Sequence, residues 1–207
     1  MEFCEHKVDT HARETDLLVV YTIDPAVEDD YINTVEQLLA REKYRVVDID
    51  LQYTAGRPNI DQKVVVAQLC MRHHVLIYHH CMAIEPSDRF ARFVNGTAYK
   101  FAMVWGSTKK DSLVELASAT IDPYYEKMKQ DSNRTHPVSW HGAWMRQLDE
   151  PHLRFAAKSV YTCYKMHRRI VDMRKCLVTQ INEGGSSHKQ SKCHKEVDDD
   201  QMIVYPS

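Results

Sequence analysis

Short apolar runs separated by amphipathic segments make up the first half of the chain. Residues 17–21 form an apolar, β-branched run, which predicts a strand. Asp24 and Pro25 then supply an N-cap and a first-turn proline for an amphipathic helix that runs to about Lys43. The pattern predicts further strands at residues 44–51, 64–70, 75–78 and 99–105, and shorter helices at residues 86–94 and 109–117.

The order of these segments predicts an α/β fold in which helices flank a mixed sheet. The run at 64–70 is apolar on both faces, so we expect it to be a central strand, with 75–78 as its hairpin partner. A long final helix is predicted from about Asp149 to about Val178.

The length of 207 residues fits one ordinary domain with short extensions. Residues 1–15 are polar, and we expect them to form a flexible lead-in. Residues 16–180 hold the strand and helix patterns and are predicted to be the single domain. Residues 181–207 combine a Gly-Gly-Ser-Ser stretch with an acidic run, which is typical of a disordered tail.

Composition narrows the function classes. With a formal net charge of −2, the chain as a whole does not attract nucleic acid, so such binding requires a local basic surface. The cysteines stand without a CxxC pair, which favours free thiols in a reducing compartment. No apolar run has the length of a membrane span, and the first residues do not have a signal-peptide pattern. We therefore expect no membrane association, and a location in the nucleus, the cytoplasm or both.

Asp48 and Asp50 are the sharpest local signal. They lie two residues apart on a predicted strand, so their side chains point to the same face. Two carboxylates buried on one face require a compensating cation, and divalent ions held by carboxylates drive phosphodiester cleavage. The alternative is that both acids lie at a solvated end of the sheet, because charged side chains are usually exposed. These two residues alone leave both interpretations open.

Over residues 17–177 the sequence resembles the Werner-syndrome-type 3′–5′ exonuclease domain, an RNase H-like (DEDDy) family, in a divergent plant-type form. VVDIDLQY looks like the first catalytic motif, and VVVAQLCMRHHVLIYHH looks like the hairpin that follows it. FVNGTAYKFAMVWGSTKKDSL looks like the region of the second motif. SWHGAW and LDEPHLRFAAKSVYTCYKMHRRI look like the approach to the final helix and its third motif. The resemblance implies an RNase H-like fold, DNA or RNA 3′ ends as substrate, and Mg²⁺ or Mn²⁺ as cofactor.

The resemblance also implies a site in which four acids hold two metal ions and a tyrosine orients the attacking water. Asp48 and Asp50 match the first motif and are the expected catalytic and metal-binding residues. Lys109, Phe155 and Ser159 stand where the family has an acid, the tyrosine and another acid. We therefore expect a degenerate site that holds no cofactor unless the chain is active. One hypothesis is that Lys109 pairs with Asp48 or Asp50 in place of a metal ion.

A different register of the alignment does not restore the site. Asp111 lies two residues after Lys109, which is about 200° around a helix, so it faces away unless the preceding loop is shifted. Residues 151–171 of the predicted final helix contain no Asp or Glu, so no register supplies an acid there.

The predicted final helix is also basic. Its candidate nucleic-acid-binding residues are Arg154, Lys158, Lys165, Arg168 and Arg169. Such a row can contact a phosphate backbone, and it can equally be the solvated face of a surface helix. Both interpretations stay open at this point.

The sequence thus predicts a pseudo-exonuclease that binds nucleic acid without cutting it. One alternative is an active, metal-dependent 3′–5′ exonuclease with a rearranged site. The other is a non-catalytic scaffold for a protein partner. Metal-dependent loss of 3′ nucleotides indicates the active enzyme, and salt-sensitive binding without cutting indicates the pseudo-exonuclease.

Overall fold

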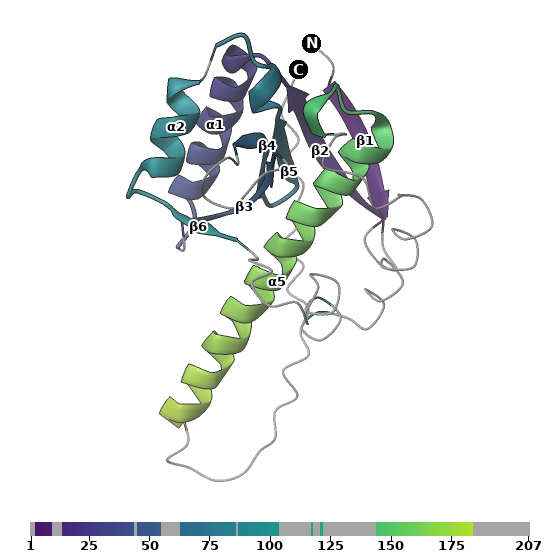
Figure 1. Ribbon diagram of the computed structural model, residues 1–207. Helices are drawn as coiled ribbons and strands as arrows, with labels where there is room; N and C mark the ends of the chain where they lie inside the picture. The colour runs from purple at the N-terminus through teal and green to yellow at the C-terminus, as the bar shows by residue number, and fades with distance from the viewer. Residues whose placement is uncertain are drawn as a thin grey trace, which may run out of the picture. The chain divides into compact units, whose positions relative to one another are not determined.

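In a computed structural model of the protein, the described residues are 3–9, 14–43, 45–54, 63–85, 87–103, 117, 121 and 144–183 (Figure 1). The strands are β1 (Phe3–Asp9), β2 (Glu14–Thr22), β3 (Val46–Tyr53), β4 (Val64–Met71), β5 (His74–Tyr78) and β6 (Lys100–Ala102). The helices are α1 (Pro25–Ala40), the 3₁₀ turn η1 (His80–Met82), α2 (Asp88–Asn95) and α5 (Glu150–Glu183).

The strands form a six-stranded mixed sheet in the order β1-β2-β5-β4-β3-β6. Strand β4 is antiparallel to β3 and to β5, whereas β2 runs parallel to β5, and β6 runs parallel to β3. The central position of β4 and its hairpin with β5 are therefore confirmed. This is the mixed, helix-flanked sheet that the RNase H-like expectation describes, and the predicted α/β class is confirmed.

Helices cover both faces of the sheet (Figure 1). On one face, α1 packs through Ile32 and Val35 into a core that includes Leu76 of β5. On the other face, α5 packs through Ala156 and Val160 into a second core. A sheet buried on both faces presents apolar side chains in both directions. The sequences of β4 and β5 are therefore nearly continuous runs of apolar residues.

The chain divides into two compact units, residues 1–169 and residues 170–207. The first unit holds the sheet, α1, α2 and the first turns of α5. In the second unit α5 continues to Glu183, and its Leu177 and Val178 are exposed. Among the described residues, no helix is long and apolar enough to span a bilayer.

Capping side chains stabilise the N-termini of three helices. The side chains of Asp24, Ser87 and Asp149 each accept a hydrogen bond from a backbone N–H two or three residues further on, at 2.9–3.1 Å. These bonds satisfy N–H groups that have no partner within the helix. The starts of α1 and α5 agree with the sequence pattern, and α2 begins two residues later than predicted.

The N-terminal lead-in differs from its expectation. Residues 1–15 were expected to be flexible, but β1 pairs with β2 in antiparallel register from Phe3 opposite Val20 to Asp9 opposite Glu14. An edge strand is held by main-chain hydrogen bonds to its neighbour, so it does not need an apolar run of its own. The hydrophobic pattern therefore gave no sign of β1.

Other predicted segments are shorter or lie outside the described residues. The strand expected at 99–105 is reduced to β6. Of the helix expected at 109–117, only Ala117 is described, and it is helical and buried. The predicted disordered tail begins within α5, and residues 184–207 lie outside the described part of the chain.

A buried polar chain fixes the segment that leads into α5. The Nε2 of His79 lies 2.8 Å from the backbone carbonyl of Trp144, and its Nδ1 lies 2.9 Å from the Tyr21 hydroxyl. A carbonyl only accepts, so Nε2 carries the proton and Nδ1 accepts from Tyr21. The backbone N–H of Leu148 donates to the same hydroxyl at 3.3 Å. Burial lowers the pKa of His79, which keeps this ring neutral.

Replacing Tyr21 with phenylalanine is expected to lower the free energy of unfolding by about 1 kcal/mol, because Nδ1 of His79 loses its donor. Urea denaturation at neutral pH measures the change. Tyr53→Phe at the end of β3 is the matched control and should shift the midpoint by less than half as much. Equal shifts in the two variants would show that the polar chain contributes little.

Candidate functional site

Asp48 and Asp50 lie on β3 and face the N-terminal part of α5. Asp48 is opposite Cys70 of β4, and Asp50 is opposite Gln68. The Asp48 carboxylate reaches His167 and the Asp50 carboxylate reaches Ser159, both on α5. The two acids therefore share one face of the sheet, as their spacing predicts.

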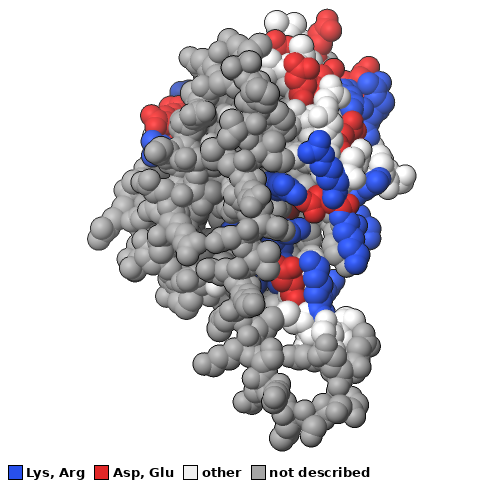
Figure 2. All heavy atoms as spheres, turned by 180° about the vertical axis from the view of Figure 1, so that it is seen from behind, with Lys and Arg blue, Asp and Glu red and all other residues white. Residues whose placement is uncertain are grey.

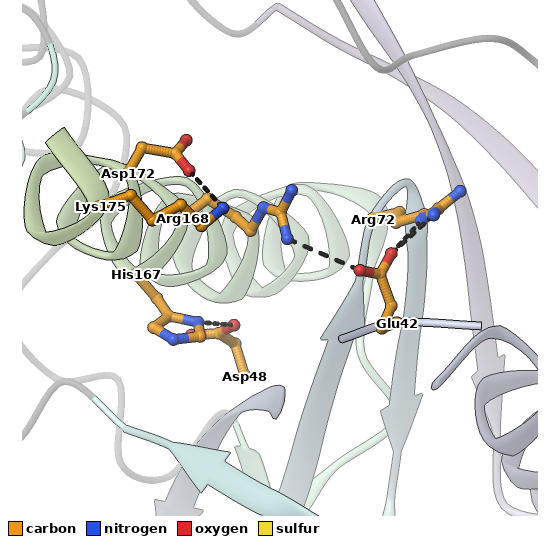
Figure 3. Close-up of polar contacts among 7 residues, drawn as sticks. All are labelled: Glu42, Asp48, Arg72, His167, Arg168, Asp172 and Lys175. Atoms are coloured by element: carbon orange, nitrogen blue, oxygen red, sulfur yellow. Dashed lines mark hydrogen bonds and ion pairs between the residues drawn. The ribbon is translucent and has the colours of Figure 1, made fainter. Parts of the chain in front are cut away.

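Asp48 is buried rather than solvated. Only 1% of its side chain is exposed, and its Oδ2 lies 3.4 Å from Nδ1 of His167 (Figure 3). Burial raises the pKa of Asp48, and the nearby His167 ring partly opposes that rise. The interpretation of a solvated sheet end is therefore wrong for this residue. An acid this deep requires a compensating partner, and among the described residues His167 faces it.

Asp50 is half-buried and is held by neutral donors. The Ser159 hydroxyl donates to its Oδ2 at 3.1 Å, and the Gln52 amide donates to the same oxygen at 3.2 Å. Burial raises the pKa of Asp50, and the hydrogen bond from Ser159 is the largest opposing influence. Ser159, which the sequence resemblance aligns with the acid of the third motif, thus donates a hydrogen bond to the carboxylate instead of adding another acid.

The helical register of α5 explains why both acids meet it. Ser159, Cys163 and His167 follow one another at four-residue intervals, so they lie on one face of the helix. Cys163 is buried between the two polar positions. His167 was not anticipated as a site residue. His167 lies eight residues after Ser159, and residues at this spacing share a face of an α-helix. This spacing is the feature of the sequence that could have identified His167.

Of the other two substituted positions, the structure describes Phe155 and does not describe Lys109. Phe155 is half-buried and packs against the core under α5, with its ring 6.4 Å from that of Trp144. It has no hydroxyl that could orient water. Lys109 and Asp111 lie outside the described residues, so the pairing of Lys109 with Asp48 or Asp50 stays a prediction. Among the described residues, the basic side chain that lies within 4 Å of the Asp48 carboxylate is His167.

A pair of divalent ions does not fit the described donors. Two-ion sites need several carboxylates that face a shared space. The described part of the chain holds no group of three or more His, Cys, Asp or Glu side chains arranged to bind a metal ion. Asp48 faces an imidazole, and Asp50 accepts from a hydroxyl and an amide. The described side chains therefore do not supply the ligands of a two-ion site.

The predicted nucleic-acid-binding residues of α5 do not form one free surface. Arg154 pairs with Glu150 on the same helix, and Lys165 lies 5.8 Å above the Tyr161 ring. At about 100° per residue, Arg154, Lys158, Lys165 and Arg169 fall on the helix face roughly opposite Ser159 and His167. Arg168 lies about 40° from Arg154 by the same measure, but its guanidinium approaches Glu42 at 3.8 Å.

No protein-family model and no curated protein matches the sequence. Among solved structures, the chain is similar to the Nibbler EXO domain of Aedes aegypti, with 11% identity and a TM-score of 0.41 over 75% of this chain and 89% of that one. It is also similar to the catalytic core of RRP6 from Trypanosoma brucei, a Cys-to-Ser mutant, with 8% identity and a TM-score of 0.45 over 80% of this chain. The match spans 50% of that RRP6 chain. At these identities the likeness concerns the fold and says nothing about the site.

Proposed function

We propose that the protein is a pseudo-exonuclease, a domain of 3′–5′ exonuclease type that binds nucleic acid and does not cut it. The observation that carries this proposal is the contact between His167 and the buried Asp48. In a working two-ion site, that carboxylate would bind a metal ion and lie open to the substrate phosphate. In this structure the His167 side chain lies beside the Asp48 carboxylate, where a metal ion would bind in such a site.

Three further features support the loss of cutting. Ser159 donates to Asp50, so this position adds no negative charge that could hold a metal ion. Phe155 provides no hydroxyl to position water, and it contributes to the core instead. With only 1% of Asp48 exposed, its carboxylate has almost no surface that a substrate phosphate could approach.

A nuclease assay tests the proposal directly. A 5′-labelled single strand and a 3′-recessed duplex are incubated with the full chain in Mg²⁺ or Mn²⁺. We expect no 3′ shortening at protein concentrations that bind the labelled strand, because Asp48 is buried beside His167 and Asp50 accepts hydrogen bonds from Ser159 and Gln52. Asp48→Ala/Asp50→Ala is the control, and Asp50→Asn is a milder variant that keeps the size of the side chain.

The other outcomes correspond to the two alternatives. A 3′-shortening ladder that both variants abolish would show that the acids serve an active exonuclease, and the proposal would be wrong. Neither cutting nor binding would favour a scaffold for a protein partner. DNA and RNA strands of the same sequence, run in parallel, show which nucleic acid is preferred.

A further inference from the structure

Basic residues gather at the end of the sheet where β3 and β6 begin. Arg41 and Lys43 follow the end of α1, Arg45 precedes β3, and Lys100 opens β6. These four side chains are exposed. Because β3 and β6 run parallel, with Lys100 N–H donating to the Arg45 carbonyl at 2.9 Å, these two residues are neighbours at the same edge.

Glu42 forms ion pairs with two more arginines next to this region. It accepts from Arg72 at 2.6 Å, and Arg168 of α5 approaches its other oxygen at 3.8 Å (Figure 3). Arg72 lies in the tight turn between β4 and β5 with a φ of 56°, a left-handed conformation that costs a non-glycine residue about 1 kcal/mol. The ion pair with Glu42 offsets that cost. Glu42 thus joins the end of α1, the β4–β5 turn and α5.

We name this region the basic surface. It comprises Arg41, Lys43, Arg45, Arg72, Lys100 and Arg168. Figure 2 shows several Lys and Arg side chains on one side of the molecule, with Asp and Glu side chains among them. Glu42 already shares its one charge between two arginines. Within the described part of the chain, Arg41, Arg45 and Lys100 form no ion pair, so their charges face solvent uncompensated.

The strand order brings the backbone positions of these cations together at one end of the sheet. The turn after β4, the start of β3 and the start of β6 are successive along the sheet. Neighbouring strands lie about 4.8 Å apart, so the backbones at Arg72, Arg45 and Lys100 are close together. Lys100 pairs with Val46, so the side chains of Arg45 and Lys100 leave opposite faces of the sheet at this end. Exposed cations gathered at one end of the sheet attract a chain of phosphates, which carry one negative charge each. Because the chain as a whole has a formal net charge of −2, the excess of positive charge at this end of the sheet is local.

We infer that the phosphate backbone of a nucleic-acid strand binds across the basic surface, and not along the outer face of α5. This inference rests on the proposed function, whose binding activity it assigns to particular residues. The surface adjoins the site, because Arg168 follows His167 on α5, and Arg45 lies three residues before Asp48. A strand bound there passes beside the closed contact between Asp48 and His167.

Two matched charge reversals separate the two surfaces. The first variant is Arg41→Glu/Arg45→Glu/Lys100→Glu, which leaves the arginines that bind Glu42 in place. The second is Arg154→Glu/Lys158→Glu/Arg169→Glu on the outer face of α5, with the same change in net charge. Binding of a fluorescein-labelled single strand to the full chain is followed by anisotropy across a range of salt concentrations. Circular dichroism confirms that each variant is folded.

We expect the first variant to bind at least tenfold more weakly than the second. Its plot of log affinity against log salt should also be shallower by about 2, since each lost phosphate contact removes about 0.7 from the slope. Equal weakening, or greater weakening in the α5 variant, overturns the assignment while leaving the proposed function intact. Absence of binding by the unmodified protein overturns both. Arg45→Gln alone should give a smaller loss in the same direction.

Discussion

At pH 8, replacing Glu28 with glutamine is expected to raise the free energy of unfolding by about 2 kcal/mol. Glu28 lies in the first turns of α1, and its side chain has no exposed surface. Neither carboxylate oxygen makes a hydrogen bond to a described residue. Burial raises its pKa from 4.5 to about 7, and the nearby Ser87 hydroxyl and Arg89 guanidinium offset the rise only in part.

The sign of the effect follows from the two pKa values. Below pH 4.5 Glu28 is protonated in both the folded and the unfolded chain, so its burial carries no ionisation cost. Between pH 4.5 and about 7 the unfolded chain loses the proton first, and stability falls as the pH rises. Above pH 7 the cost is complete. At about 1.4 kcal/mol per pKa unit it is roughly 3 kcal/mol, which local relaxation reduces to about 2.

Urea denaturation of Glu28→Gln and the unmodified protein between pH 4 and pH 8 measures this difference. The two curves should coincide near pH 4 and separate as the pH increases. Asp30→Asn removes an exposed carboxylate from the same helix and should change stability by less than about 0.5 kcal/mol at every pH. A gap that is constant with pH would show that Glu28 is ionised in the folded protein and finds a partner there.

Much of the fold was predictable because local patterns determine it. The run at 64–70 is apolar on both faces, and this property alone places β4 inside the sheet. The caps Asp24 and Asp149 mark the starts of α1 and α5 in the sequence as clearly as in the structure. The edge strand β1 was not predicted, because main-chain pairing with β2 holds it in place. Such pairing does not require a pattern of apolar side chains in the sequence.

The site was predictable only in part. The two-residue spacing of Asp48 and Asp50 fixes a common face, but it does not reveal what covers that face. Ser159 and His167 reach the acids from α5, and this depends on how α5 packs on the sheet. The burial of Glu28 is similar, because it follows from the tertiary packing around α1 and α2 rather than from any pattern within α1. Long-range packing is the information that one sequence does not display.

Replacing His167 with leucine is expected to lower the free energy of unfolding by about 2–3 kcal/mol at neutral pH. Removing one partner of a buried pair leaves the other charge uncompensated, which costs about 3–5 kcal/mol when the pair is fully buried. His167 remains 23% exposed and lies 3.4 Å from Asp48, which reduces the expected cost. Arg154→Leu breaks the exposed pair with Glu150 and should cost no more than about 0.5 kcal/mol.

A double-mutant cycle isolates the contact between the two residues. Burial raises the pKa of Asp48, so its ionised form is disfavoured in the folded chain, and Asp48→Asn should cost little or stabilise the protein at neutral pH. In the Asp48→Asn background, His167→Leu should lose most of its effect, which leaves a coupling energy of about 1–2 kcal/mol. Additive changes would show that the two side chains do not interact, and the main support for the proposed function would be lost.

Manganese binding links this cycle to function. If His167 fills the place of a metal ion, the unmodified protein should bind no Mn²⁺ by calorimetry, and its thermal midpoint should not change with millimolar Mn²⁺. His167→Leu removes the competing side chain and leaves Asp48 available to a cation. Recovery of stability on addition of Mn²⁺ in this variant, and not in Asp48→Asn/His167→Leu, would identify His167 as the side chain that took the place of the metal. Tight Mn²⁺ binding by the unmodified protein would instead indicate an active metal site that includes Asp48.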